Sequence, residues 1–265
     1  MTWSIVARDA SGAFGVAIAS RFFAVGALCP HARSAVGALS TQALLNPLLA
    51  APALEGMAAR REPAGLLAEL LAGDAGSAHR QVHLIDAQGR GAAHTGAECV
   101  PWSGHLLRAG YSVAGNMLAG PQVVEATAQA YDANAAQPFA LRLLAALAAG
   151  EAAGGDKRGK QAAALLIYNG RDYPALDMRV DDHAEPIVEL MRLYTVSLER
   201  FQPFVECLAS RERPAGLFDR TLIEAHVAAF GAAHQATAAA QASAPATPAT
   251  SPASAPATPT PAAPA

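Results

Sequence analysis

Thr2 is the residue of this sequence with the clearest chemical potential. It follows Met1 directly and leads into an apolar, strand-like run over residues 3–8. If Met1 is removed, as is common before a small second residue, Thr2 carries both a hydroxyl and a free α-amine. An α-amine has an ordinary pKa of ~8, so it can take the proton from the hydroxyl near neutral pH. The pattern predicts a nucleophile with its own base, which needs neither a histidine nor a metal.

The residues after Thr2 predict a rigid support for it. Residues 5–7 are followed by a turn-forming group over 9–12 and by a second apolar run over 14–20. This pattern is typical of a β-hairpin. A nucleophile at the head of a buried strand is held in place, whereas an ordinary chain end frays. The alternative is that the Met-Thr start has no chemical role.

Composition and charge exclude several other classes of protein. The 265 residues carry a net charge of -3 with scattered basic residues, which argues against nucleic-acid binding. The start has no signal-peptide pattern, and Arg21 interrupts the apolar stretch over 14–28. We therefore expect a cytoplasmic protein without a membrane span. The three widely spaced cysteines fit reduced thiols. We expect no metal and no cofactor, a small molecule as the partner, and leave homo-oligomerisation open.

The order of the predicted elements favours an α+β fold. After the hairpin, strands are predicted over 34–42, 79–86, 90–95, 111–118, 161–168 and 176–180, and helices over 53–72, 121–133, from Pro138 to before Gly154, 185–200 and 218–233. Because the strands come in hairpins, antiparallel sheets with helices outside are favoured over a doubly wound parallel sheet. Residues 1–233 form the predicted domain. The Ala-, Pro-, Thr- and Ser-rich residues 234–265 are predicted to be a disordered tail.

Several ordered motifs of this sequence resemble one bacterial family. They are TWSIVARD at 2–9, GVAIASRFFAVG at 15–26, STQALLNP at 40–47, GNMLAG at 115–120, GGDKRGKQ at 154–161 and RVDDH at 179–183. Together they resemble the family catalogued as domain of unknown function 1028, which is grouped with the N-terminal-nucleophile (Ntn) hydrolases. The resemblance implies a four-layer αββα sandwich, in which two antiparallel sheets are flanked by helices. It also implies that Thr2 is the nucleophile, presented by the first strand in a cleft.

Two further residues are expected to act with Thr2. Asn116 follows Gly115 at a strand end, where its amide can donate to an oxyanion. Its alternative role is that of a turn-forming side chain. Arg21 ends the second strand of the hairpin, where its guanidinium can lower the pKa of the Thr2 amine or bind a carboxylate. Its alternative is an ordinary surface position.

Four polar residues are candidates for substrate binding. Asp156 and Arg158 belong to a glycine-rich, charged loop that can bind an anionic group, although such loops are often only polar connections. Gln42 and Asn46 are polar residues of the STQALLNP motif near the third predicted strand.

The chemistry predicted for this set is hydrolysis of a C–N bond in a small polar metabolite, either an amide or an enamine or imine. Two alternatives stay open. One is a non-catalytic small-molecule-binding protein on the same scaffold, since a fold does not fix a function. The other is a metal-assisted hydrolase using Asp181, Asp182 and His183. Neighbouring side chains of an extended chain point to opposite faces, so a polar network or a helix N-cap by Asp182 explains this run as well.

Overall fold

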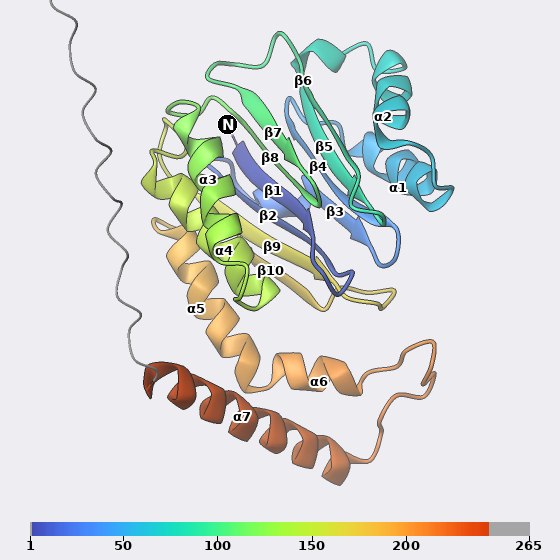
Figure 1. Ribbon diagram of the computed structural model, residues 1–265, viewed down its shortest axis with the longest axis vertical. Helices are drawn as coiled ribbons and strands as arrows, with labels where there is room; N and C mark the ends of the chain where they lie inside the picture. The colour runs from blue at the N-terminus through green and yellow to red at the C-terminus, as the bar shows by residue number, and fades with distance from the viewer. Residues whose placement is uncertain (1, 244–265) are drawn as a thin grey trace, which may run out of the picture.

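The computed structural model describes residues 2–243, and its centre is a pair of antiparallel sheets that lie face to face (Figure 1). The six-stranded sheet has the order β10 (Leu176–Val180), β9 (Ala162–Tyr168), β2 (Phe14–Ser20), β1 (Thr2–Arg8), β8 (Tyr111–Asn116) and β7 (Gly104–Arg108). The four-stranded sheet has the order β3 (Pro30–Arg33), β4 (Gly37–Ala43), β5 (Arg80–Asp86) and β6 (Gly91–Thr95). Strand β1 therefore lies in the middle of the larger sheet.

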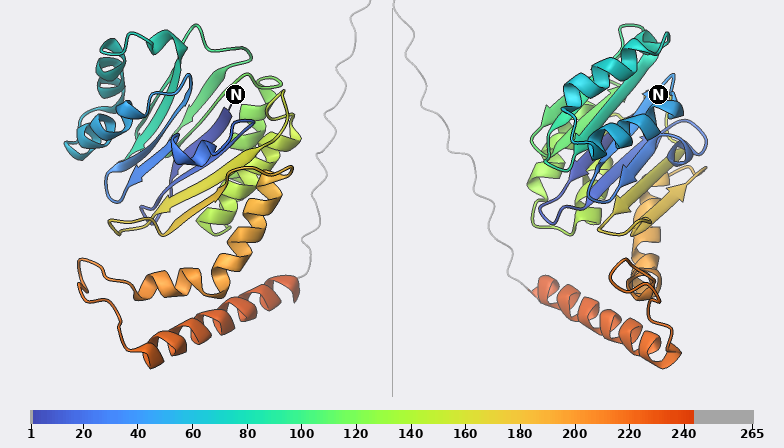
Figure 2. Two further views of the ribbon diagram at one scale, coloured as in Figure 1. Left: turned by 180° about the vertical axis from the view of Figure 1, so that it is seen from behind. Right: turned by 90° about the vertical axis from the view of Figure 1, so that its right-hand side faces the viewer.

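Helices cover the outer faces of both sheets (Figure 2). Helices α1 (Ala50–Ala58) and α2 (Pro63–Ala72) pack their leucines and Met57 against the smaller sheet. Helices α3 (Gln122–Ala133), α4 (Phe139–Ala152) and α5 (Pro186–Glu199) cover the larger sheet and enclose the main apolar core. The predicted α+β fold with two antiparallel sheets and external helices is confirmed. None of the described helices is both long and apolar enough to span a membrane.

The opening hairpin forms for local reasons. Asp9 begins the turn, and its carboxylate accepts hydrogen bonds from the Ser11 hydroxyl at 2.7 Å and the Ala13 amide at 2.9 Å. Gly12 has a φ of +90°, a conformation that favours glycine. Because side chains alternate along a strand, Trp3 faces the helices and Ser4 faces the other sheet. Every residue of β1 from Thr2 to Ala7 is buried. Separating this strand from its neighbours would expose these side chains and would therefore cost free energy.

Two strands, β3 and β7, and one α-helix, the short α6 (Phe201–Cys207), were not predicted from the sequence. Both strands lie at sheet edges, and β7 has no buried residue, so neither carries a strong hydrophobic pattern. The strand predicted over 34–42 is correspondingly β4 alone, preceded by a turn that connects it to β3.

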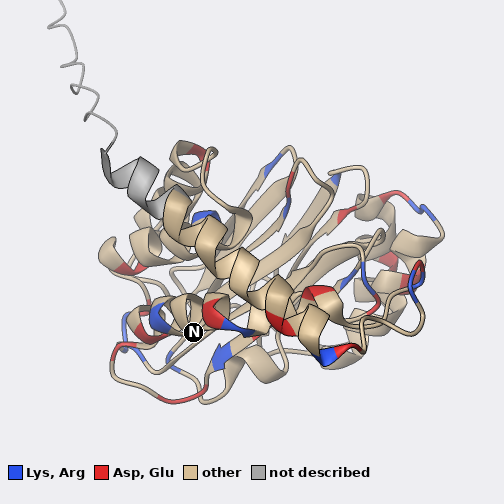
Figure 3. Cartoon of the chain, turned by 90° about the horizontal axis from the view of Figure 1, so that it is seen from below, with Lys and Arg blue, Asp and Glu red and all other residues tan. Residues whose placement is uncertain are grey.

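The terminal helix is longer than the sequence predicts. Helix α7 runs over Arg220–Ser243 instead of ending at 233, and so enters the segment predicted to be disordered. Alanine, the best helix former, supplies half of these extra residues. Figure 3 shows α7 crossing the underside of the molecule, and its charged residues Arg220 and Glu224 lie in its first two turns. The rest of the predicted tail lies outside the described residues.

A layer of buried polar side chains connects the two sheets. Gln42 of β4 lies at its centre, and its side-chain oxygen accepts hydrogen bonds from Ser4 at 2.7 Å and Ser40 at 3.1 Å. Its amide donates to the side-chain oxygen of Gln81 at 2.9 Å and to the Ala114 carbonyl at 3.2 Å. Buried polar groups without partners are costly, whereas a fully satisfied network fixes one arrangement. The network therefore fixes how the two sheets face each other.

His83 of β5 belongs to this layer and is completely buried. Ser4 donates its hydroxyl proton to Gln42, so at 2.8 Å from His83 Nε2 it must accept. The proton of the neutral ring is therefore assigned to Nε2, and Nδ1 accepts from the Ser112 hydroxyl at 3.1 Å. Burial lowers the pKa of His83 from 6.5 to about 3, with a smaller contribution from the charge of His105. The ring is a structural link between the sheets and is neutral at physiological pH.

The buried His83 should make stability depend on pH. Between pH 6.5 and about 3 the unfolded chain binds a proton on this histidine that the native protein does not. The free energy of unfolding should therefore fall as the pH is lowered through this window, by up to ~1.4 kcal/mol per pH unit. Urea unfolding at pH 6.5, 5.5 and 4.5 measures the slope. The His83→Gln variant should lose this contribution, and identical slopes in the two proteins would contradict the assignment.

Candidate active site

Thr2 stands at the head of the central strand β1, between the ends of its two neighbours. It pairs directly with Asn116, the last residue of β8. On the other side, its hydroxyl oxygen lies 3.1 Å from the hydroxyl oxygen of Ser20, the last residue of β2. Thr2 is 6% exposed, and both neighbours are buried as well. Two hydroxyls and one amide thus come together at one end of the larger sheet.

Ser20 was not singled out from the sequence. The register of the hairpin identifies it. Trp3 pairs with Ala19, so Thr2 and Ser20 are the next residues outward on their strands and lie opposite each other. Because directly opposed residues of an antiparallel pair share one face, the two hydroxyls point the same way. The sequence predicted the hairpin, but its exact register depends on the turn.

Asn116 lies beside Thr2, and its amide is already oriented by the protein. The amide nitrogen donates to the side-chain oxygen of Gln81 at 3.0 Å and to the Thr2 carbonyl oxygen at 3.5 Å. Gln81 in turn donates to the Gly115 carbonyl at 2.8 Å and the Gly104 carbonyl at 3.1 Å. Gln81 was not predicted as a site residue. It connects the polar layer between the sheets to the residue opposite Thr2.

Asp156 and Arg158 also lie near this end of the larger sheet, and they join the loop over 154–160 to the end of β2. The buried Asp156 carboxylate accepts from the backbone amides of Arg21 and Arg158, each at 2.8 Å. It also forms an ion pair of 3.2 Å with the half-exposed Arg158 guanidinium. The Arg21 guanidinium donates to the Arg158 carbonyl oxygen. The contacts of Asp156 are those of a structural anchor, and substrate contact by these residues stays a prediction.

Gln42 and Asn46 make structural contacts. Gln42 is fully buried in the layer between the sheets. Asn46 caps the short 3₁₀ helix Pro47–Leu49 by accepting from the Leu48 amide at 3.2 Å, and it donates to Asp74 at 3.0 Å. Arg80 and Asn46 hold the pKa of the Asp74 carboxyl well below its usual range. A substrate-binding role for Gln42 or Asn46 stays a prediction.

The run Asp181-Asp182-His183 does not converge on one point. Asp182 accepts a hydrogen bond from Gln161 at 3.2 Å, and the His183 ring accepts from the Glu185 amide at 2.9 Å. The N-cap of α5 is Glu185, so the interpretation of Asp182 as the cap is wrong. Within residues 2–243, no group of three or more His, Cys, Asp or Glu side chains is placed to hold a metal ion. The metal-assisted alternative therefore loses its predicted ligand set.

Two small hollows involve residues next to Thr2. The Asn116 hollow, of about 210 Å³, is lined by Ala43, Leu44, His79, Glu98, Cys99, Val100, Asn116 and Met117. The Arg21 hollow, of about 260 Å³, is lined by Arg21, Lys160, Gln161, Asp182, His183 and Ala184. Arg21 follows Ser20 at the end of β2, and Asn116 ends β8, so the two hollows involve the strands on opposite sides of Thr2.

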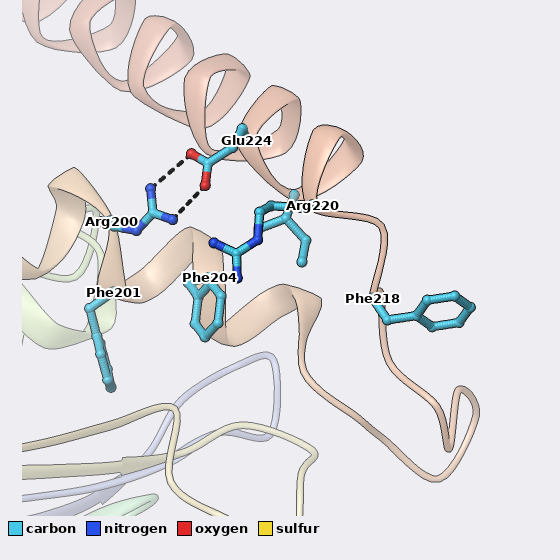
Figure 4. Close-up of a pocket in the computed structure, with 7 residues that line it drawn as sticks. Arg200, Phe201, Phe204, Phe218, Arg220 and Glu224 are labelled. Carbon is cyan, nitrogen blue, oxygen red and sulfur yellow. Dashed lines mark hydrogen bonds and ion pairs between the residues drawn. The ribbon is translucent and has the colours of Figure 1, made fainter.

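A larger cavity, of about 600 Å³, lies elsewhere, between α6 and α7 (Figure 4). Phe201, Phe204 and Phe218 line it, and Arg200 forms a two-pronged ion pair with Glu224 across it. No residue at the head of β1 lines this cavity. Size alone therefore does not locate the candidate active site.

The chain belongs to the family of unknown function DUF1028, whose model matches residues 2–190. Among solved structures it is similar to protein SPO2555 of Silicibacter pomeroyi, a protein described with the same family, at 29% identity and a TM-score of 0.77, over 83% of this chain and 96% of that one. A similarity to Anbu (ancestral beta-subunit) from Yersinia bercovieri has 14% identity and a TM-score of 0.34, over 74% of this chain and 94% of that one. A TM-score this low does not establish a common fold. No curated protein matches significantly.

Removing the Asp156 carboxylate should destabilise the protein far more than removing its ion-pair partner. Asp156→Ala leaves the backbone amides of Arg21 and Arg158 without their acceptor and should cost about 2 to 4 kcal/mol. Arg158→Ala removes a half-exposed partner and should cost no more than about 1 kcal/mol. Urea unfolding of both variants measures the difference. Equal small losses would show that Asp156 does not anchor the loop.

Proposed function

We propose that this protein is an Ntn-type hydrolase that cleaves a C–N bond in a small metabolite, with Thr2 as the nucleophile after removal of Met1. The observation that supports this most is the position of the Thr2 hydroxyl at the head of the central strand, 3.1 Å from the Ser20 hydroxyl and opposite Asn116. Two facing antiparallel sheets with helices outside are also the arrangement that the resemblance to Ntn hydrolases implies.

The reaction needs only groups that Thr2 and its neighbours supply. The free α-amine takes the hydroxyl proton, and the hydroxyl oxygen attacks the carbonyl carbon of an amide. The amine then gives that proton to the departing nitrogen as the C–N bond breaks, which leaves an ester on Thr2. Water, deprotonated by the same amine, attacks the ester carbon. The C–O bond to Thr2 then breaks, the acid leaves, and the amine returns the proton to the Thr2 oxygen. Ser20, within hydrogen-bond distance of the Thr2 hydroxyl, holds this hydroxyl in one orientation.

Asn116 is proposed to stabilise the oxyanion that forms during the attack. Its amide is held by Gln81 through a hydrogen bond of ordinary length, 3.0 Å. The second donation, to the Thr2 carbonyl, is 3.5 Å long and therefore weak. A developing negative charge competes easily for that hydrogen, because hydrogen bonds to charged acceptors are about twice as strong as neutral ones. Gln81 would then act as a positioning residue for the donor.

The Arg21 hollow is proposed to bind the polar part of the substrate. Its wall combines two cationic side chains, Arg21 and Lys160, with the polar residues Gln161, Asp182 and His183. Lys160 is already paired with Glu151 and Glu185. Arg21 is therefore the residue we propose to contact a polar or anionic substrate group. An imine carbon can be attacked by the same hydroxyl, and an enamine becomes an iminium ion with such a carbon once its β-carbon is protonated, so the proposal covers these C–N bonds as well.

The first test concerns the amine and hydroxyl of Thr2. Intact-mass measurement should show that Met1 is absent from the purified protein, and p-nitrophenyl acetate should acylate Thr2 with a burst of nitrophenolate. Thr2→Ala should abolish the burst without unfolding the protein, and Thr2→Ser should retain part of it, because a primary hydroxyl supports the same chemistry. Retention of Met1 in a protein that still shows the burst, or a normal burst in Thr2→Ala, would refute the mechanism.

The second test separates the roles of Asn116 and Arg21. Asn116→Ala should slow acylation at saturating ester by about a hundredfold or more, the scale of losing one oxyanion donor. Arg21→Ala should instead raise the ester concentration needed for half-maximal rate when the ester carries a carboxylate, because uniform binding is lost. Asn134→Ala, at the end of α3, is a control that should change neither value. An Asn116→Ala variant with an unchanged rate would remove Asn116 from the mechanism.

A further inference from the structure

The Asn116 hollow is formed by three separate loops at the Thr2 end of the molecule, together with His79 from the short segment before β5. These loops follow β4, β6 and β8, and contribute Leu44, Val100 and Met117 respectively. The Met117 amide donates to the Val100 carbonyl at 2.8 Å, which joins two of the loops directly. The buried Asn116 side chain reaches the hollow from the side of Thr2. Any molecule bound here therefore contacts the residue that pairs with the proposed nucleophile.

Unusual backbone conformations open this hollow. Ala43, at the end of β4, has a φ of 68°, and Met117, directly after β8, has a φ of 53°. Residues with a Cβ atom avoid this left-handed region because the Cβ atom comes too close to the following carbonyl oxygen. Such strain persists where the surrounding structure enforces it, and it clusters at ligand sites. Both residues line the Asn116 hollow. The chain therefore leaves the sheets at the ends of β4 and β8 in the same place.

The walls of the hollow are mainly apolar but have an acidic group. Leu44 is 62% exposed and Val100 is 46% exposed. Ala43 and Met117 add further apolar surface, while Glu98 and His79 supply the polar groups. Large apolar side chains that gather around a hollow are typical of a binding surface. The carboxylate of Glu98 repels a ligand group of negative charge.

We propose that the Asn116 hollow binds a compact, apolar, uncharged group attached to the scissile C–N bond, and so selects the substrate. This inference rests on the proposed function. A volume of about 210 Å³ corresponds to ~7 water molecules at liquid density, which suits a short alkyl chain or a single ring and excludes a folded peptide. The substrate class is then a small amide with an apolar end in this hollow and a polar end toward Arg21.

The test is a series of esters that acylate Thr2. In the acyl series, p-nitrophenol is the leaving group, and the acyl group is acetate, butyrate, hexanoate or the monoanionic succinate. In the leaving-group series, the acyl group is acetate, and the leaving group is phenol or 4-hydroxybenzoate. One of the two series should show a preference. In that series, the ester with the apolar group should react at least tenfold faster per unit concentration than the ester with the short or anionic group. This is the scale of burying two methylene groups.

Two exposed leucines of one loop provide a matched pair of variants. Leu44→Trp fills the hollow and should abolish the apolar preference, so that the apolar ester reacts no faster than its short or anionic counterpart. Leu48→Trp, at a residue that is 82% exposed and does not line the hollow, should keep the preference. Acylation of Thr2 without any apolar preference, or equal effects of both variants, would overturn this inference alone. Absence of acylation by every ester would overturn the proposed function and the inference with it.

Discussion

The hydrogen bonds of Gln42 and Gln81 between the two sheets are the constraint on which the candidate site depends. Gln42 joins β4 to β1 and β8, and Gln81 joins β5 to the end of β8. Each amide has a fixed donor and acceptor side, so the network accepts only one relative position of the sheets. That position places Gln81 within 3.0 Å of the Asn116 amide, opposite Thr2. A purely apolar interface would permit the sheets to slide relative to each other.

The head of β1 combines two kinds of environment. On the side of β2, charged groups are paired with one another, with Asp156 holding the backbone of Arg21 and the side chain of Arg158. On the side of β8, the chain is turned by Met117 in a left-handed conformation, and apolar side chains remain exposed. A small molecule placed across Thr2 therefore meets opposite polarities at its two ends. In the reaction proposed above, this difference would orient the substrate.

Membership of the DUF1028 family and the similarity to SPO2555 establish the family, but they name no reaction. The chemistry proposed for this protein therefore depends on Thr2 and the residues around it. The hydroxyl of Ser20 and the amide of Asn116 are fixed by strand pairing and by Gln81. Rigid strands hold such groups more precisely than loops do.

The sequence by itself determined the elements whose signals are local. The turn residues Asp9 and Gly12, the alternation along β1, and the proline that begins α2 each depend on neighbours in the chain, so the hairpin and most helices were predictable. The position of Thr2 directly after Met1, and that of Asn116 at a strand end, singled out these two residues as candidates. Only the tertiary structure showed that Ser20 and Gln81 belong to the site and that Gln42 is enclosed, because these roles depend on strand register and on the packing of the two sheets. Edge strands β3 and β7 escaped prediction for the same reason, since pairing stabilises them more than their own pattern does.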